Sequence, residues 1–486
     1  MAKIELFKQQ AYIAGRWVNS ESGQVEEITN PATGEVIGTV PSLSAAETRQ
    51  AIESAEAARH AWAAQTAKER SGLLMQWRHL MLEHVDTLAK ILTLEQGKPL
   101  AEAKGEIMYA ANYLEWFAEE GKRLYGEVIP THKADARLLV IKQPIGVVAA
   151  ITPWNFPAAM ITRKCAPALA AGCAFIVKPA PDTPFSALAL AALAEQAGIP
   201  AGIFNVVTGD AQVIGGELTA SKLVRKLSFT GSTSVGKLLM QQCASTVKKV
   251  SLELGGNAPF IVFSDADLDD AVAGAIASKF RNTGQTCVCT NRFLIHDNVH
   301  DAFVEKLTTA VQQLNVGNGM DPEVHQGPLI NTAAVTRVTE HVADALGKGA
   351  QLATGGKAHG LGGHFYEPTV IVDVTDDMRV AQEEIFGPLA PVFRFHTEEE
   401  AIQMANNTDA GLAAYVYTRD IGRVWRVGEA LEYGMVGINE GVVSTEVAPF
   451  GGIKESGIGR EGARQGIEDY VETKYLMMGG ISTSGG

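Results

Sequence analysis

The feature that most constrains the fold is a regular alternation of short apolar runs with helix-like segments after residue 138. Runs rich in β-branched and aromatic residues, such as AFIVK (174–178), IFNVV (203–207) and KLSFT (226–230), alternate with longer segments of helical periodicity. Strands that alternate with helices form βαβ units, which build a parallel sheet covered by helices. The sequence therefore predicts an α/β fold with a doubly wound sheet, and such sheets bind ligands at the carboxyl ends of their strands.

The chain on either side extends this pattern. Ser44 and Glu47 have the spacing of a capping box at a helix start, and a helical region over about 68–121 is interrupted at QGKP (96–99). A second α/β unit begins at PFIVF (259–263) and continues to near the end of the chain. We interpret the N-terminal helices as scaffold for a multi-domain protein.

Charge and cysteine content narrow the classes of function. The chain has 41 basic and 55 acidic side chains, a formal net charge of −14, and no basic block, which disfavours nucleic acid and membranes as partners. The five cysteines lack the spacing of a disulfide framework and indicate a reducing compartment. No apolar run approaches the ~20 residues of a membrane span, and the N-terminus lacks a signal-like apolar region. We therefore expect a cytoplasmic protein whose acidic ligands would need a local basic pocket.

Two stretches are candidates for a cofactor site. In FTGSTSVG (229–236), Gly231 and Ser232 stand between a strand and a helix, where backbone N–H groups could bind a pyrophosphate. Lys178 stands at the end of another strand, where its ammonium could contact a ribose hydroxyl or a phosphate. A glycine turn that merely caps a helix and a merely solvated lysine remain open alternatives for these residues.

Three further residues are candidates for chemistry on a carbonyl. Cys287 follows a tight turn at Gly284, and nearby backbone N–H groups could stabilise a thiolate or an oxyanion. Asn155, in TPWNFP, could donate a hydrogen bond to a developing oxyanion. Glu253, near the end of an apolar strand, would have a raised pKa suited to a general base. Taken alone, a cysteine is more often a small core residue than a nucleophile, so that alternative stays open for Cys287.

The motifs TPWNFP, FTGS, LELGGNAP, GQTC and EEIFGP stand in the order and spacing that resemble the NAD(P)-dependent aldehyde dehydrogenase superfamily. The resemblance covers nearly the whole chain, from NPATGEVI to PFGGIKESGIGREG, and is strongest to NADP-type succinate-semialdehyde dehydrogenases. It implies a Rossmann-type cofactor domain (1–122 and 144–254), a catalytic domain (255–470) and a small β-arm (123–143 and 471–486). The arm would join subunits into a dimer or tetramer, and the last residues of the chain are expected to fray.

The resemblance also implies roles for the chemical residues. Cys287 would attack the aldehyde, while the Asn155 side chain and the Cys287 N–H would hold the oxyanion. Hydride transfer to the nicotinamide would leave a thioester, and Glu253 would activate the water that hydrolyses it. The presence of Glu253 disfavours relatives that transfer the acyl group to coenzyme A, and the presence of both Cys287 and Glu253 disfavours a non-enzymatic member. No metal is expected.

The resemblance implies a set of cofactor residues around the nicotinamide, the pyrophosphate and the adenine ribose. These are Thr152, Trp154, Lys178, Pro181, Gly231, Ser232, Glu384 and Phe386. In NAD-preferring relatives the position of Pro181 usually carries a glutamate that would repel a 2′-phosphate. We therefore expect NADP to be preferred and NAD to be possible, although Asp182 could reach the same ribose.

Five residues resemble the substrate site of succinate-semialdehyde dehydrogenases: Arg163, Arg281, Ser444, Phe156 and Phe450. Two guanidinium groups and a hydroxyl could hold the far carboxylate of an ω-oxo acid. A structural ion pair is the alternative for each arginine. Succinate semialdehyde, an intermediate of γ-aminobutyrate catabolism, is the expected substrate. Glutarate semialdehyde or another ω-oxo acid is the alternative, because one methylene changes discrimination by only about 1–3 kcal/mol.

Cys289 is two residues from Cys287. A reversible disulfide that silences the nucleophile is one hypothesis for this pair, and a packed loop cysteine is the other.

Overall fold

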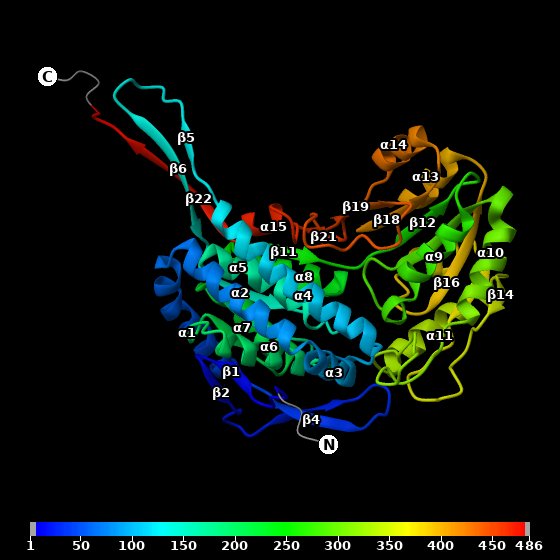
Figure 1. Cartoon of the computed structure of the whole chain (residues 1–486), viewed down its shortest axis with the longest axis horizontal. Coiled ribbons are helices and arrows are strands. Elements are labelled where there is room, and N and C mark those ends of the chain that lie inside the picture. Colours follow the sequence, from blue (N-terminus) through cyan, green and yellow to red (C-terminus); the bar gives the residue numbers. More distant parts are fainter. Residues whose placement is uncertain (1–5, 482–486) are drawn as a thin grey trace.

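The structure is a computed structural model that describes residues 6–481, and its largest features are two mainly parallel sheets (Figure 1). The first sheet consists, in spatial order, of β2 (Arg16–Val18), β1 (Ala11–Ile13), β9 (Phe204–Val206), β8 (Ala174–Lys178), β7 (Val147–Ile151), β10 (Val224–Thr230), β11 (Lys249–Glu253) and β21 (Gly457–Ile458). The five strands from β9 to β11 are parallel, and β1 and β21 join the edges antiparallel. The predicted parallel sheet is confirmed.

The order of these strands creates a ligand-binding edge. The chain runs from β7 to β8 and β9 on one side, and then returns to place β10 and β11 on the other side of β7. Ile151 of β7 is paired in register with Lys178 of β8 and with Phe229 of β10, and Thr230 is paired with Glu253. The carboxyl ends of these strands therefore meet at a point where the topology switches direction, which is the usual binding site of such sheets.

Helices cover this sheet in two packed groups. One group comprises α1 (Ala45–Ala64), α7 (Ala211–Ala220) and α8 (Thr233–Cys243), and the other comprises α2 (Ala67–Glu83), α3 (Val85–Gln96), α4 (Leu100–Glu120), α5 (Ala159–Ala171) and α6 (Pro184–Gln196). The capping box is confirmed, since the Ser44 hydroxyl accepts from the Glu47 N–H at 3.3 Å and the Glu47 carboxylate accepts from the Ser44 N–H at 2.8 Å. The helical region breaks at Gly97, as expected, and also at His84, which the sequence pattern does not reveal.

The second sheet consists, in spatial order, of β14 (Gln351–Thr354), β15 (Thr369–Val372), β16 (Leu389–Phe395), β13 (Thr290–His296), β12 (Ala258–Val262), β18 (Ala413–Tyr417) and β19 (Met435–Ile438). All neighbouring strands are parallel except β14 and β15. The accompanying helices are α9 (Leu268–Lys279), α10 (Asp297–Gln312), α11 (Thr332–Gly347), α13 (Glu398–Asn406) and α14 (Ile421–Ala430). This unit has its own apolar core on each side of the sheet.

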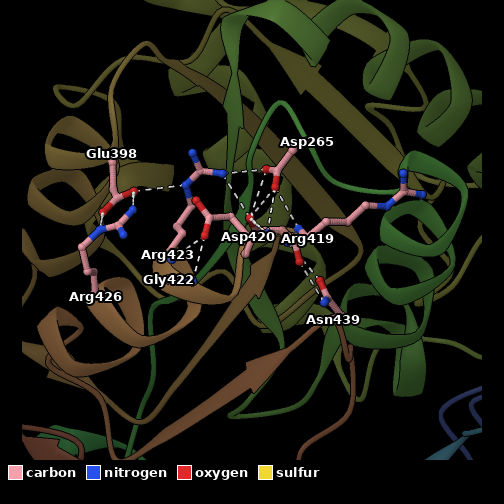
Figure 2. Close-up of polar contacts among 9 residues, drawn as sticks. Asp265, Glu398, Arg419, Asp420, Gly422, Arg423, Arg426 and Asn439 are labelled. Carbon is pink, nitrogen blue, oxygen red and sulfur yellow. Dashed lines mark hydrogen bonds and ion pairs between the residues drawn. The ribbon is translucent and has the colours of Figure 1, made fainter.

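Charged side chains tie α13 and α14 to the second sheet (Figure 2). Arg423 donates to Asp265 at 2.7 Å and to Glu398 at 3.1 Å, and Arg426 adds two bonds to Glu398. Asp420 caps α14 by accepting from the N–H groups that follow it. None of these residues lines the cavities described below. We therefore assign this network to the stability of the fold.

The third sheet is an arm that projects from the body in Figure 1. It comprises β22 (Val471–Met478), β6 (Arg137–Pro144) and β5 (Glu127–Ile129), all antiparallel. Residues 482–486, expected to fray, lie outside the described residues. The segment 457–470, which we assigned to the catalytic domain, packs with the first sheet instead: β21 pairs with β11, and Ile467 is buried in the first core. The other domain limits stay a prediction.

Several short elements complete the described chain. They are the pairs β3 (Val25–Thr29) with β4 (Val36–Pro41) and β17 (Ala410–Gly411) with β20 (Ile453–Lys454), and the helical turns η1 (Gly121–Arg123), η2 (Ala244–Thr246), η3 (Arg281–Gly284), α12 (Arg379–Gln382) and α15 (Gln465–Glu468). Across residues 6–481, none of the helices combines the length and apolar character needed to cross a bilayer. The same residues contain no cluster of three or more histidine, cysteine, aspartate or glutamate side chains arranged to hold a metal ion.

Candidate active site

Two cavities meet at Cys287. One, of about 320 Å³, lies at the switch point of the first sheet, and the other, of about 310 Å³, lies beside α4 and α5. Cys287 and Met160 line both cavities. A thiol at such a position can react with a molecule in one cavity while a second molecule occupies the other. We refer to them as the switch-point cavity and the α4–α5 cavity.

The switch-point cavity is built from the ends of β7 and β10. Trp154 and Asn155 follow β7, while Gly231 and Ser232 follow β10. Ser232 caps α8, and its hydroxyl accepts from the Val235 N–H at 3.4 Å, so the positive end of that helix faces the cavity. These residues offer an anion-binding turn of the kind that holds a pyrophosphate.

The opposite wall of this cavity comes from the second unit. Trp154 and Phe386 meet edge to face with ring centroids 5.5 Å apart, and Phe386 has a positive φ of 54°. Glu384 is beside them, accepts from the Gly256 N–H at 3.0 Å, and has a pKa raised to about 7 by burial. An acceptor and an aromatic wall next to an anion-binding turn fit the ribose, ring and pyrophosphate of a nicotinamide dinucleotide.

Three predicted cofactor residues lie outside the lining of this cavity. The hydroxyl of Thr152 is buried without a protein partner in the described chain. Lys178 is also buried, donates to the Pro179 carbonyl at 3.0 Å, and has a pKa lowered to about 8 by burial, against the opposing effect of nearby carboxylates that include Asp182. Pro181 is exposed at the adjoining loop. Near the end of β8 the structure thus has a lysine, Lys178. Residue 181 in the adjoining loop is a proline, so no glutamate side chain is present there.

The loop before Cys287 has an unusual backbone. Asn282, Thr283 and Gly284 have φ values of 50°, 57° and 73°, in the left-handed region that a β-branched residue such as Thr283 rarely adopts. A Cβ at Gly284 would lie 2.2 Å from the Gly387 carbonyl oxygen, so only glycine fits there. The predicted tight turn is confirmed, and it holds the cysteine between the two sheets.

Two donors converge beside Cys287. The Asn155 amide donates one hydrogen to the Gln285 carbonyl at 3.1 Å, which leaves its second hydrogen free. Within residues 6–481, the Cys287 N–H donates to no acceptor. A free amide hydrogen and a free backbone N–H next to a nucleophile are the elements of an oxyanion hole.

Burial favours the neutral forms of the Cys287 thiol and of the Glu253 carboxyl group. Burial raises the pKa of Cys287 to about 12, so the nearby N–H groups do not produce a resting thiolate. Burial and the neighbouring carboxylate of Glu461 raise the pKa of Glu253 well above its ordinary value, as the sequence predicts. One carboxylate oxygen of Glu253 has no hydrogen-bond partner among the described residues. A neutral thiol and a basic, buried carboxylate suit proton transfer during turnover.

The α4–α5 cavity brings together all five predicted substrate residues: Phe156, Arg163, Arg281, Ser444 and Phe450. The two arginines differ. The Arg281 side chain makes no ion pair or hydrogen bond with any residue from 6 to 481, and its guanidinium lies 5.5 Å from the Phe156 ring centroid. Arg163 is fully buried over Phe450 and is paired with Glu461 at 2.8 Å. The structure therefore combines a free guanidinium with one that is already partly neutralised.

Other residues of this cavity were missed by the sequence analysis. They are Glu102, Gly105, Glu106, Tyr109, Met160, Thr286 and Val288. The spacing of Glu102, Glu106 and Tyr109 on one helix face was a usable signal, because positions three and four apart are neighbours on a helix. Glu461 was missed as well: it is the second glutamate of the PFGGIKESGIGREG motif (449–462), and nothing local in the sequence indicates that it pairs with Arg163.

Cys289 is buried in the same loop as a free thiol. Its Sγ lies 3.3 Å from the Thr290 carbonyl and 3.6 Å from the Lys279 carbonyl. This packing is compatible with a loop cysteine, and the disulfide with Cys287 stays a hypothesis.

Comparisons with known proteins agree with this geometry. The model of the aldehyde dehydrogenase family matches residues 17–476. The chain is 64% identical to a glutarate-semialdehyde dehydrogenase of Pseudomonas aeruginosa, over 98% of this chain and 99% of the relative. It is equally 64% identical to the succinate-semialdehyde dehydrogenase (NADP(+)) GabD of Escherichia coli, over 98% of each. The crystal structure of a succinate-semialdehyde dehydrogenase from Burkholderia pseudomallei matches with a TM-score of 0.98 at 63% identity, over 99% of each chain. Agreement of this extent shows that the chain belongs to the aldehyde dehydrogenase family.

Proposed function

We propose that the protein oxidises succinate semialdehyde to succinate and reduces NADP. The observation that carries the proposal is the position of Cys287 between the switch-point cavity, which fits a dinucleotide, and the α4–α5 cavity, which contains the free guanidinium of Arg281. The aldehyde end of the substrate would reach Cys287, and its carboxylate would reach Arg281.

The residues around Cys287 support a covalent route. The thiol adds to the aldehyde carbon and releases its proton to solvent, while the second hydrogen of the Asn155 amide and the Cys287 N–H bind the resulting oxyanion. NADP, when bound in the switch-point cavity, supplies the hydride acceptor that converts this adduct into a thioester. Glu253 then takes a proton from water as the water attacks the thioester, and returns that proton to the departing cysteine sulfur, which releases the acid and restores the thiol.

The acid end of the substrate would be held in the α4–α5 cavity. Arg281 can form a forked pair of hydrogen bonds with a carboxylate, because its donors are free in the described structure. The Ser444 hydroxyl lines the same cavity. Arg163 contributes less free charge, since Glu461 already pairs with it. We therefore assign the larger share of acid recognition to Arg281.

The cofactor proposal rests on the groups near the end of β8. Lys178 could pair with a 2′-phosphate, and Pro181 offers no carboxylate to repel one. NADP is therefore proposed as the preferred cofactor, and NAD remains usable because Ser232, Glu384 and Phe386 would bind parts common to both.

Glutarate semialdehyde is the second candidate substrate. The chain is as similar to the glutarate-semialdehyde dehydrogenase of Pseudomonas aeruginosa as to the succinate-semialdehyde dehydrogenase of Escherichia coli. A carboxylate held by Arg281 is common to both substrates, and only the length of the intervening chain differs.

One experiment tests substrate and cofactor together. The values of kcat/KM are measured for succinate semialdehyde, glutarate semialdehyde and butanal, each with NADP and with NAD, from the rate of reduced-cofactor formation. We expect both acids to exceed butanal by roughly 10- to 100-fold or more, because hydrogen bonds to a charged group contribute about 1.5–3 kcal/mol each. If butanal matches the acids, the assigned role of the arginines is wrong. The ratio of the two acids decides the chain length.

The arm supports a further proposal, that the protein forms a homodimer or homotetramer. Large apolar side chains of its strands are exposed, including Val128 at 77% and Tyr475 at 54%. An exposed strand with apolar side chains favours pairing with another chain. Light scattering of the purified protein, which gives the mass of the particle, would measure the oligomeric state directly.

A further inference from the structure

A buried lysine lies between the two loops that form the site. Lys98 lies in the break between α3 and α4, and its side chain has no exposed surface. Its ammonium group donates to the main-chain carbonyl of Asn155 at 2.7 Å and to the carboxylate of Glu106 at 2.6 Å. It also lies 3.8 Å from the ring centroid of Phe156. A buried charge is costly unless its donors are used, and here they are directed at the loop that carries the proposed oxyanion donor.

The Asn155 carbonyl receives a second donor from the cysteine loop. The Asn282 amide donates to it at 3.0 Å and to the Gln285 carbonyl at 3.2 Å, while Gln96 donates to the Asn282 side chain at 3.0 Å. The Asn155 amide donates to the same Gln285 carbonyl at 3.1 Å. A single hydrogen-bond network therefore joins the loop after β7 to the loop before Cys287. Lys98 is the charged donor of this network, through its bond to the Asn155 carbonyl.

The acidic residues of α4 extend this network to α5. Glu106 accepts from the Ala158 and Ala159 N–H groups at 2.9 Å and 3.2 Å, at the start of the helix that carries Arg163. Glu102 accepts from the Asn282 N–H at 2.8 Å. Both carboxylates stand on one face of α4, because residues four apart on a helix are neighbours. The carboxylates of α4 next to Lys98 thus accept hydrogen bonds from the main chain of the loop after β7 and from the main chain of the loop before Cys287.

We propose that Lys98 is a positioning residue for the oxyanion hole: by holding the Asn155 main chain, it aims the Asn155 amide at the aldehyde oxygen. The inference rests on the proposed role of Asn155. Lys98 does not line either cavity, so its effect reaches the substrate through Asn155. Oxyanion donors act because they are preorganised, and a displacement of about 1 Å can cost on the order of 100-fold in rate.

The test compares Lys98→Met, Asn155→Ala and the double variant in a double-mutant cycle. If Lys98 acts through Asn155, Lys98→Met should lower kcat about 10- to 100-fold for succinate semialdehyde and for butanal alike, since both aldehydes need the oxyanion hole. The dissociation constant of NADP, measured by fluorescence titration, should not change. In the Asn155→Ala background, Lys98→Met should cause little further loss, because the two residues serve one function.

Lys98→Met leaves the Glu106 carboxylate buried without its partner, and this change could prevent folding. The Lys98→Met/Glu106→Gln variant removes both charges and keeps an acceptor for the Ala158 and Ala159 N–H groups. It should show the same loss of kcat. Lys248→Met is a matched control, because Lys248 is a buried lysine that donates to the main-chain carbonyls of Leu218, Thr219 and Ser221, away from both cavities. It should leave kcat unchanged.

The outcomes separate this inference from the proposed function. Additive losses of Lys98→Met and Asn155→Ala would overturn the positioning role, as would an unchanged kcat or a full recovery of kcat in Lys98→Met/Glu106→Gln. If Asn155→Ala alone keeps the wild-type kcat, the proposed role of Asn155 is wrong, and the inference about Lys98 is overturned with it.

Discussion

Replacement of Arg281 by alanine is the perturbation that most directly probes substrate recognition. Arg281 is half-buried in the α4–α5 cavity, and its side chain is free of ion pairs and hydrogen bonds within the described chain. Its removal therefore leaves no protein carboxylate without its partner. Loss of the guanidinium should affect the substrate carboxylate and little else.

The magnitude follows from the bonds that Arg281 can form. Two hydrogen bonds to a carboxylate contribute about 1.5–3 kcal/mol each, and partial exposure favours the low end of that range. At that low end the two bonds together contribute about 3 kcal/mol, and their loss corresponds to a decrease of roughly 150-fold in kcat/KM for succinate semialdehyde. Butanal, which has no carboxylate, should lose far less. Arg281→Lys should fall between these values, because lysine keeps the charge but not the fork.

The assay is the initial rate of NADPH formation at substrate concentrations below KM, with each aldehyde and each variant. Arg337→Ala is the matched control, since it removes an exposed guanidinium from the switch-point cavity and should change the rates of both aldehydes by the same factor. Equal losses for the two aldehydes in Arg281→Ala would refute the reasoning and assign Arg281 to the structure of the loop.

Four other predictions concern the chemistry and the cofactor. The pKa of Glu253 is raised by burial, and a base must be ionised to act, so kcat should rise with pH as this carboxyl group loses its proton, at a pH above the ordinary range of a glutamate. Glu253→Gln should keep a burst of NADPH but lose steady turnover, and a wild-type turnover in this variant would contradict the role. Protonated Lys178 has a pKa of about 8, so the affinity for NADP should fall as the pH rises through that value, and fluorescence titration of Lys178→Met should show no such dependence. Pro181→Glu should lower kcat/KM with NADP more than with NAD, whereas an equal change would argue against a 2′-phosphate at this position. If Cys289 forms a reversible disulfide with Cys287, peroxide should inactivate the wild type, and a thiol reductant should restore its activity. Cys289→Ser, treated in the same way, should not regain activity after the reductant is added. Full activity of the wild type after peroxide would exclude the switch.

The parts of the site that the sequence predicts are those with a local signature. The strand-helix alternation predicts the parallel sheet, and the glycine turns predict where Ser232 and Cys287 must stand. The pairing of Arg163 with Glu461 has no local signature, because the two residues are 298 positions apart and meet only when α5 packs against the segment after β21. Lys98 looks like part of a helix break in the sequence, and its role depends on a carbonyl 57 positions away.

Cys287 lines both the switch-point cavity and the α4–α5 cavity, and this position has a consequence for chemical labelling of the protein. An electrophile with an acidic tail would enter the α4–α5 cavity and modify the thiol from that side, while the lining that includes Ser232, Glu384 and Phe386 would stay accessible. A protein labelled in this way should still bind the dinucleotide although it can no longer turn over. Such a labelled form would allow cofactor affinity to be measured separately from the reaction that the cofactor serves.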